Sequence, residues 1–218
     1  MRMFCPALSV IPRPTAVLRI CLLPCLLASA PAQAFVVAIT PGPKALFLQV
    51  GAGTMAGGNY NNAGTPGSNS TINRVSLNVP AASVGTGSRV MITDSLVTDS
   101  PYDGFARCNK PTQVYVGGFY RAFGAAGNAT LTVTTPLNLN NSLGGTVAFS
   151  TISWVSGGNQ NTSPRIPSGT FAGGTTQTLT SIAFNTYFED CLQFFYANTQ
   201  LLPFGAYNGR AVYTLTSP

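Results

Sequence analysis

The sequence predicts an all-β protein built as an antiparallel β-sandwich. Many short segments alternate apolar and polar residues, and 23 glycines and 16 prolines interrupt the 218-residue chain. No segment shows a sustained apolar stripe of helical period with capping residues. Many short strands in one body favour two packed sheets, because one wide sheet would expose its apolar face and its edges. A closed β-barrel is the alternative, since alternation does not show whether the sheets join at both edges.

The strand signal recurs nine times along the chain. It is clearest at 74–79, where Val75, Leu77 and Val79 alternate with polar residues, so that one face of the strand is apolar. Pairs such as Asn208-Gly209 supply turn chemistry between strands. Helices are expected to be one turn long or absent, with a candidate turn near 80–83. The expected strands are 45–50, 74–79, 89–93, 113–120, 130–134, 146–155, 177–184, 192–197 and 210–216.

Two stretches rich in small polar residues, 51–71 and 159–174, are expected to be long loops, and we expect the first to be mobile. The first loop opens on Gly51-Ala52-Gly53-Thr54-Met55-Ala56, which matches the G-x-G-x-x-A dinucleotide motif. That motif requires a helix whose N-terminus binds pyrophosphate, and the Gly- and Asn-rich run that follows cannot sustain one. We therefore expect no dinucleotide cofactor.

Residues 1–34 have the pattern of a cleaved signal peptide. Three arginines accompany an apolar run at 20–30, and Ala32-Gln33-Ala34 provides the small-x-small cleavage pattern. The run contains Pro24 and is shorter than the roughly 20 residues that span a bilayer, so we expect no membrane span after cleavage. The mature protein is then one domain, 35–218, located in the periplasm, on the cell surface or outside the cell.

Two of the five cysteines remain after this cleavage, Cys108 and Cys191. An oxidising compartment favours a disulfide between them. The bond would close a loop of about 80 residues, which the chain-entropy model values at roughly 4 to 5 kcal/mol.

Composition excludes several classes of function. The chain has no histidine, which removes the commonest general base, the usual zinc imidazole and the Ser-His-Asp triad. Three of the 11 basic residues lie in the signal segment, leaving eight against five acidic residues, a net charge of +3. The eight are scattered singly, so no basic stripe is present to bind nucleic acid. We expect a protein that is not an enzyme and does not bind nucleic acid.

All five carboxylates precede one of the two remaining cysteines in the sequence. A disulfide would bring the two groups near each other, and an oxygen-rich site of this kind can hold calcium. The alternative is that Arg107, Lys110 and Arg121 neutralise them as surface ion pairs. Apart from calcium, no cofactor is expected. The calcium candidates are Asp94, Asp99, Asp103, Glu189 and Asp190.

Aromatic residues offer a possible sugar-binding face. Trp154 and Tyr120 are the candidate glycan contacts, because flat rings stack on sugars. The alternative for Trp154 is a place in the core, since burial of its large ring is worth several kcal/mol.

The C-terminal segment 204–216 contains Gly205, Tyr207, Gly209 and the run Tyr213-Thr214-Leu215. It resembles the final strand of bacterial secreted Ig-like sandwiches, among them pilin-type subunits and spore-coat-U-like domains. The resemblance implies an envelope or extracellular protein with a structural, fimbrial-like or adhesive role. It leaves an Ig-like and a jelly-roll-like strand order both open.

The segment 45–50 is apolar on nearly both faces. It fits an ordinary first strand of its own sheet, or donation into a groove of a neighbouring subunit. We expect an exported structural or adhesive surface protein, with a pilin-like subunit as one version and a carbohydrate-binding module as the alternative. The expected partners are other copies of the chain, envelope proteins or glycans.

Overall fold

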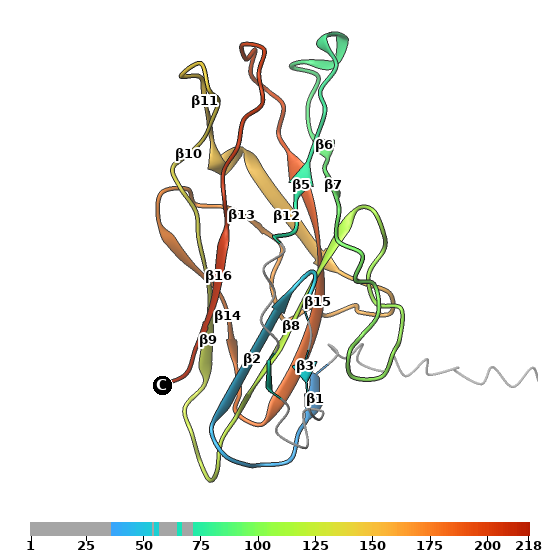
Figure 1. Cartoon of the computed structure of the whole chain (residues 1–218), viewed down its shortest axis with the longest axis vertical. Coiled ribbons are helices and arrows are strands. Elements are labelled where there is room, and N and C mark those ends of the chain that lie inside the picture. Colours follow the sequence, from blue (N-terminus) through green and yellow to red (C-terminus); the bar gives the residue numbers. More distant parts are fainter. Residues whose placement is uncertain (1–35, 54, 57–64, 67–71) are drawn as a thin grey trace, which may run out of the picture. The chain divides into compact units, whose positions relative to one another are not determined.

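The computed structural model describes residues 36–53, 55–56, 65–66 and 72–218, all within the unit Ala32–Pro218 (Figure 1). The expected signal peptide, 1–34, and the expected mature N-terminus, Phe35, lie outside the described residues. Export and cleavage therefore stay predictions. The described chain is formed of antiparallel strands, with two single turns of 3-10 helix, η1 (Ala81–Ser83) and η2 (Phe149–Thr151).

The larger sheet has seven strands arranged around one long central strand, β15 (Thr186–Tyr196). Two short strands add to opposite ends and opposite sides of β15: β1 (Val36–Ala38) beside its start and β6 (Arg89–Val90) beside its end. The remaining order is β13 (Gly169–Thr170), β12 (Ile152–Gly157), β15, β8 (Gln113–Arg121) and β2 (Ala45–Val50).

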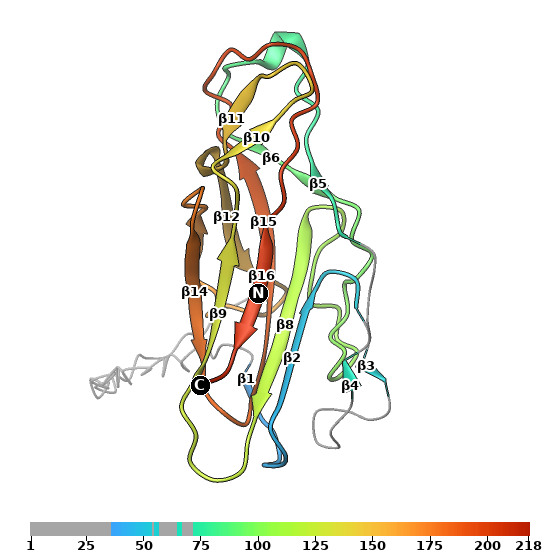
Figure 2. The ribbon, with the colours of Figure 1, turned by 60° about the vertical axis from the view of Figure 1, so that its left-hand side comes forward.

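The second main sheet has three strands, with β9 (Ala129–Thr134) between β14 (Thr176–Ile182) and β16 (Val212–Thr216). Figure 2 shows this sheet and the β8–β2 part of the larger sheet as separate layers. Three strand pairs complete the described fold. They are β3 (Met55–Ala56) with β4 (Thr65–Pro66), β5 (Val75–Ser76) with β7 (Ile92–Thr93), and β10 (Asn138–Asn140) with β11 (Thr146–Ala148).

The two sheets enclose one apolar core, which confirms the predicted sandwich; they do not close into a barrel in the described part of the chain. In β9, Ala129, Leu131 and Val133 are buried while the threonines between them are more exposed, as the period of two requires. Trp154 lies in this core, with its ring centroid 4.9 Å from that of Phe171. Its indole N–H donates to the Pro167 carbonyl oxygen at 2.8 Å.

The strand β15 is buried on both faces. Phe188, Leu192 and Phe194 point into the sandwich core. Tyr187 and Cys191, on the opposite face, belong to two smaller apolar clusters that cover the outside of the sheet. The sequence of a strand that is covered on both faces is a nearly continuous run of buried residues, and it does not alternate between apolar and polar residues.

Strand boundaries differ from the sequence prediction in several places. The predicted strand 74–79 is a strand only at Val75–Ser76, and the predicted strand 89–93 divides into β6, which pairs with β15, and β7, which pairs with β5. The predicted strand 146–155 is interrupted at η2, where the chain leaves the β10–β11 pair and enters the larger sheet as β12. The predicted strand 192–197 is the second half of β15, because burial on both faces removes the alternation that marks a strand. The helical turn expected near 80–83 is present as η1.

The two predicted long loops contain short strands. The first holds the β3–β4 pair, and its remaining residues, 54, 57–64 and 67–71, lie outside the described residues. No helix follows Gly53 among the described residues, as expected from the composition. The second loop holds β13, which pairs with β12.

The disulfide between Cys108 and Cys191 is present, as predicted, and ties the segment before β8 to the centre of β15. Its cysteines are 83 residues apart in the sequence.

We expect replacement of both cysteines by serine to lower the free energy of unfolding by about 4 kcal/mol, because the unfolded chain regains its loop entropy. Urea denaturation checks this. An unchanged midpoint in the double variant, or in wild type after reduction, would contradict it.

Candidate functional site

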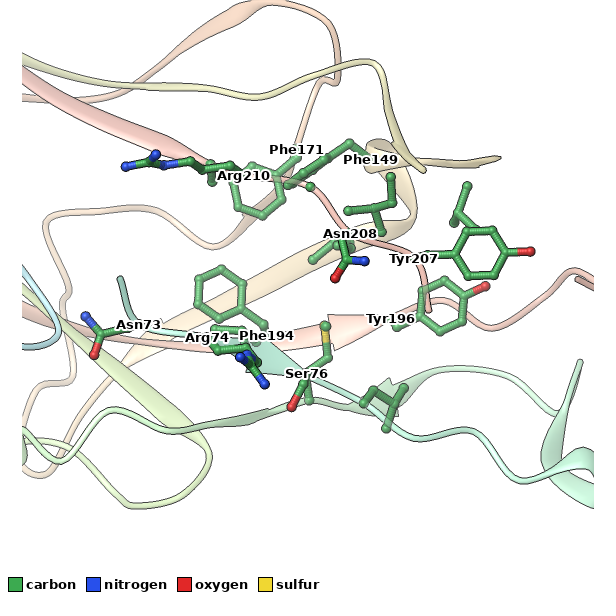
Figure 3. A pocket seen from close by; sticks show the side chains of 18 of the residues that line it. Asn73, Arg74, Ser76, Phe149, Phe171, Phe194, Tyr196, Tyr207, Asn208 and Arg210 are labelled. Atoms are coloured by element: carbon green, nitrogen blue, oxygen red, sulfur yellow. The ribbon is translucent and has the colours of Figure 1, made fainter. Parts of the chain in front are cut away.

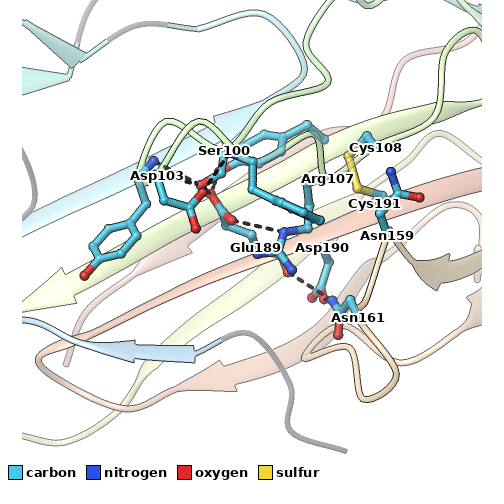
Figure 4. Close-up of polar contacts among 12 residues, drawn as sticks. Ser100, Asp103, Arg107, Cys108, Asn159, Asn161, Glu189, Asp190 and Cys191 are labelled. Atoms are coloured by element: carbon cyan, nitrogen blue, oxygen red, sulfur yellow. Dashed lines mark hydrogen bonds and ion pairs between the residues drawn. A yellow bond between two sulfur atoms is a disulfide. The ribbon is translucent and has the colours of Figure 1, made fainter.

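Two regions of the described structure hold the residues that could carry function. The first is a buried polar cluster beside the disulfide, where the carboxylates Glu189 and Asp190 lie (Figure 4). The second is a groove along the open side of the sandwich (Figure 3).

Glu189 is the centre of the polar cluster and has 0% exposure. Its Oε1 accepts hydrogen bonds from the hydroxyls of Tyr187 at 2.5 Å and Tyr115 at 2.9 Å, and from that of Ser100. Its Oε2 lies 3.5 Å from Nε of Arg107, which is also buried. The charge of this carboxylate is thus compensated inside the protein, which is the condition for burying an ion without a large loss of stability.

Asp190, the next residue, points to the opposite face of β15 and holds the loop that precedes β13. Its Oδ1 accepts from the Asn161 side-chain amide at 2.8 Å and from the Arg165 backbone N–H at 3.1 Å. Its Oδ2 accepts from the Ile166 backbone N–H at 2.7 Å. Burial raises the pKa of Asp190 to about 6, although these three donors favour the charged form.

The other three calcium candidates, Asp94, Asp99 and Asp103, are exposed, and the structure does not bring them together with Glu189 and Asp190 into one site. Each accepts a local hydrogen bond instead, from Arg74 N–H, Thr98 Oγ1 and Phe105 N–H respectively. Within the part of the chain that is described, no group of three or more acidic or cysteine side chains could hold a metal ion. The expected surface neutralisation is replaced by a buried Arg107–Glu189 pair.

Both candidate glycan contacts are buried. Trp154 is 4% exposed and Tyr120 is 3% exposed, and both belong to the sandwich core. In this structure neither ring has a free face on which a sugar could stack. The alternative stated for Trp154, a place in the core, is confirmed.

The groove follows the side of the sandwich where the two sheets are not joined. Its volume is about 1370 Å³, larger than the roughly 300–1,000 Å³ of ordinary small-molecule pockets. Side chains of the core reach its lining, among them Val114, Phe149, Ile152, Phe171 and Phe194. The groove is therefore an opening into the apolar interior.

Two extended segments form the walls of this groove. On one wall Val75, Leu77 and Val79 alternate with exposed residues, and on the other Ala211 and Tyr213 do so. Among the described strands, β5 pairs only with β7, and β16 pairs only with β9. Each of these two strands therefore has one backbone edge that pairs with no other described strand.

The sequence predicts strands at 74–79 and 210–216, which include β5 and β16 of the two walls, but it does not predict the groove. The alternation at 75–79 predicted an apolar face, which is correct. Alternation does not show whether a facing strand covers that face, and this depends on where the segment 203–213, which leads into β16, lies in the folded chain. No local signal in the sequence carries that information.

No family model, no curated protein and no solved structure matches the chain. Over the described residues, neither helical turn has the length or the apolar character needed to cross a membrane.

The raised pKa of Asp190 predicts a pH dependence of stability. Between its ordinary value of 3.8 and about 6, the folded state binds more protons than the unfolded state. Its contribution to the free energy of unfolding therefore falls as pH rises through this window. We expect the wild type to lose on the order of 2 kcal/mol between pH 4 and 7 relative to Asp190→Asn. Urea titrations across this range check it, with the exposed Asp99→Asn as control; a constant or rising difference would contradict it.

The Arg107–Glu189 pair predicts a strong coupling of the two residues. Glu189→Gln leaves a buried guanidinium uncompensated and should cost about 3 to 5 kcal/mol of unfolding free energy. We expect Arg107→Met combined with Glu189→Gln to cost clearly less than the sum of the single changes. A double-mutant cycle in urea measures this, and Asp103→Asn, at an exposed carboxylate, serves as control. Additive costs would contradict the role given to the pair.

Proposed function

We propose that the protein is an exported, non-enzymatic structural component of a bacterial envelope or surface, a pilin-like subunit. In this role its groove accepts an extended segment of another chain. The observation that carries the proposal is that the apolar core opens between β5 and β16, each of which has one edge without a strand partner among the described residues.

The chemistry of the groove suits an extended polypeptide. An added strand would bond to the free backbone groups of β5 or β16, and main-chain hydrogen bonds of this kind provide affinity in β-augmentation. Every second side chain of such a strand would point into the groove, toward Phe149, Phe171 and Phe194. Each apolar side chain so buried contributes roughly 25 cal/mol per Å² of surface removed from water.

The chain's own first strands already have partners. The segment Ala45–Val50, considered above as a donated strand, is β2, and it pairs with β8 over its whole length. Val36–Ala38 is β1 and pairs with the start of β15. Donation of either segment would remove it from its own sheet, so we assign this chain the accepting role. The carbohydrate-binding alternative has no support from Trp154 and Tyr120, because both are buried.

A direct test uses a capped, fluorescein-labelled peptide of about ten alternating valine and threonine residues, which spans about 33 Å as an extended strand. We expect saturable binding to the mature protein by fluorescence polarisation. Leu77→Asp, on the groove wall, should weaken it at least about tenfold, because a carboxylate would then be buried against apolar side chains.

Thr178→Asp is the control, since Thr178 is an exposed residue of β14 outside the groove lining. It should keep most of the affinity. Failure of the wild type to bind the peptide, or equal losses in both variants, would contradict the proposed function.

A further inference from the structure

The groove carries charge of one sign. Its lining contains two arginines, Arg74 and Arg210, and no Asp or Glu among the described residues. Figure 3 shows Arg210 near Phe149 and Phe171 along one side and Arg74 near Ser76 along the other. Two cations beside an apolar groove favour an occupant that brings negative charge.

Both arginines are exposed, and neither forms an ion pair with a residue that the structure describes. Asp94 accepts the backbone N–H of Arg74 at 2.6 Å, but it is not part of the groove lining. The guanidinium groups can therefore bind a carboxylate that arrives with the occupant. Arginine suits this task, because its planar fork donates two parallel hydrogen bonds to a carboxylate.

A second copy of this chain is poorly suited to supply that carboxylate. Residues 36–50, the segment that a copy could donate from its start, contain no Asp or Glu and include Lys44. Like charges placed opposite each other on neighbouring strands are destabilising. Of the five carboxylates of the chain, Glu189 and Asp190 are fixed inside the folded domain.

We propose, building on the proposed function, that the occupant of the groove is a segment of a different protein. In this segment apolar side chains alternate with polar ones, and at least one polar position is a carboxylate that pairs with Arg74 or Arg210. The apolar positions provide most of the affinity. The two arginines select an acidic partner over another copy of the chain.

The test uses four labelled peptides. One is the neutral valine–threonine peptide, two carry Asp or Lys at its central polar position, and the fourth is the chain's own segment 36–50. We expect the Asp peptide to bind at least about fivefold more tightly than the Lys peptide at low salt. The preference should shrink at high salt, because exposed charges are screened. The 36–50 peptide should bind more weakly than the Asp peptide.

Substitution then assigns the preference to residues. Arg74→Gln combined with Arg210→Gln should abolish the discrimination between the Asp and Lys peptides. Arg89→Gln, at an arginine outside the groove lining, should keep it. Thermal unfolding of each variant confirms that the fold is retained.

The outcomes separate the two proposals. Equal affinities for the Asp and Lys peptides, discrimination that survives the double substitution, or tightest binding of the 36–50 peptide would overturn the acidic partner alone. If the wild-type protein does not bind the neutral peptide either, the proposed function is overturned. Binding of palmitate with no peptide bound would overturn both and indicate an anionic amphiphile.

Discussion

The pairing of β15 is the constraint on which the rest of the structure depends. This strand has neighbours on both sides, β1 and β12 on one and β8 and β6 on the other, and it is covered on both faces. Its backbone groups thus find partners inside the sheet, and its side chains must suit a dry environment on both sides. Glu189 and Asp190 lie in this strand, so each needs donors brought from elsewhere in the chain. The disulfide at Cys191 holds the segment before β8 against the larger sheet, and the loop that contains Asn161 holds the segment before β13 there. These two segments bring the donors that the carboxylates need.

The same sandwich is closed on one side and open on the other. Near β12, Trp154 packs against Phe171 and donates to the Pro167 carbonyl oxygen, and Asp190 anchors the loop that precedes β13. Between β5 and the segment 203–213, no strand fills the corresponding space in the described structure, and the lining of the groove includes core aromatic rings. An exposed strand edge is a site for pairing with another chain, and natural proteins usually cover or charge it. Here Arg74 and Arg210 charge the groove, and the proposed preference for an acidic partner depends on these two side chains.

The acidic residues show how far sequence reasoning reaches. Their clustering before the two cysteines is a real feature, and the disulfide that joins these regions was predicted correctly. The interpretation as a metal site assumed that nearness would make the carboxylates face one another. Instead, Glu189 and Asp190 point to opposite faces of β15, because side chains alternate along a strand. Glu189 contacts tyrosine and serine hydroxyls and Arg107, and Asp190 accepts from loop amides. The sequence leaves both places open for Trp154, a sugar-binding face and the core, because the inward or outward direction of its side chain depends on which face of its strand the second sheet covers.

The sequence by itself determined the all-β class, most of the strands, the turn at 80–83 and the Cys108–Cys191 bond. These follow from local periodicity, turn chemistry and the small number of cysteines, all of which can be read from neighbouring residues. Only the tertiary structure decided that β15 extends back to Thr186, that the strand predicted at 146–155 splits between two sheets, and that a groove opens beside Val75. These features depend on contacts between segments far apart in the chain, and the free energy of such contacts is set by which faces and edges meet after folding.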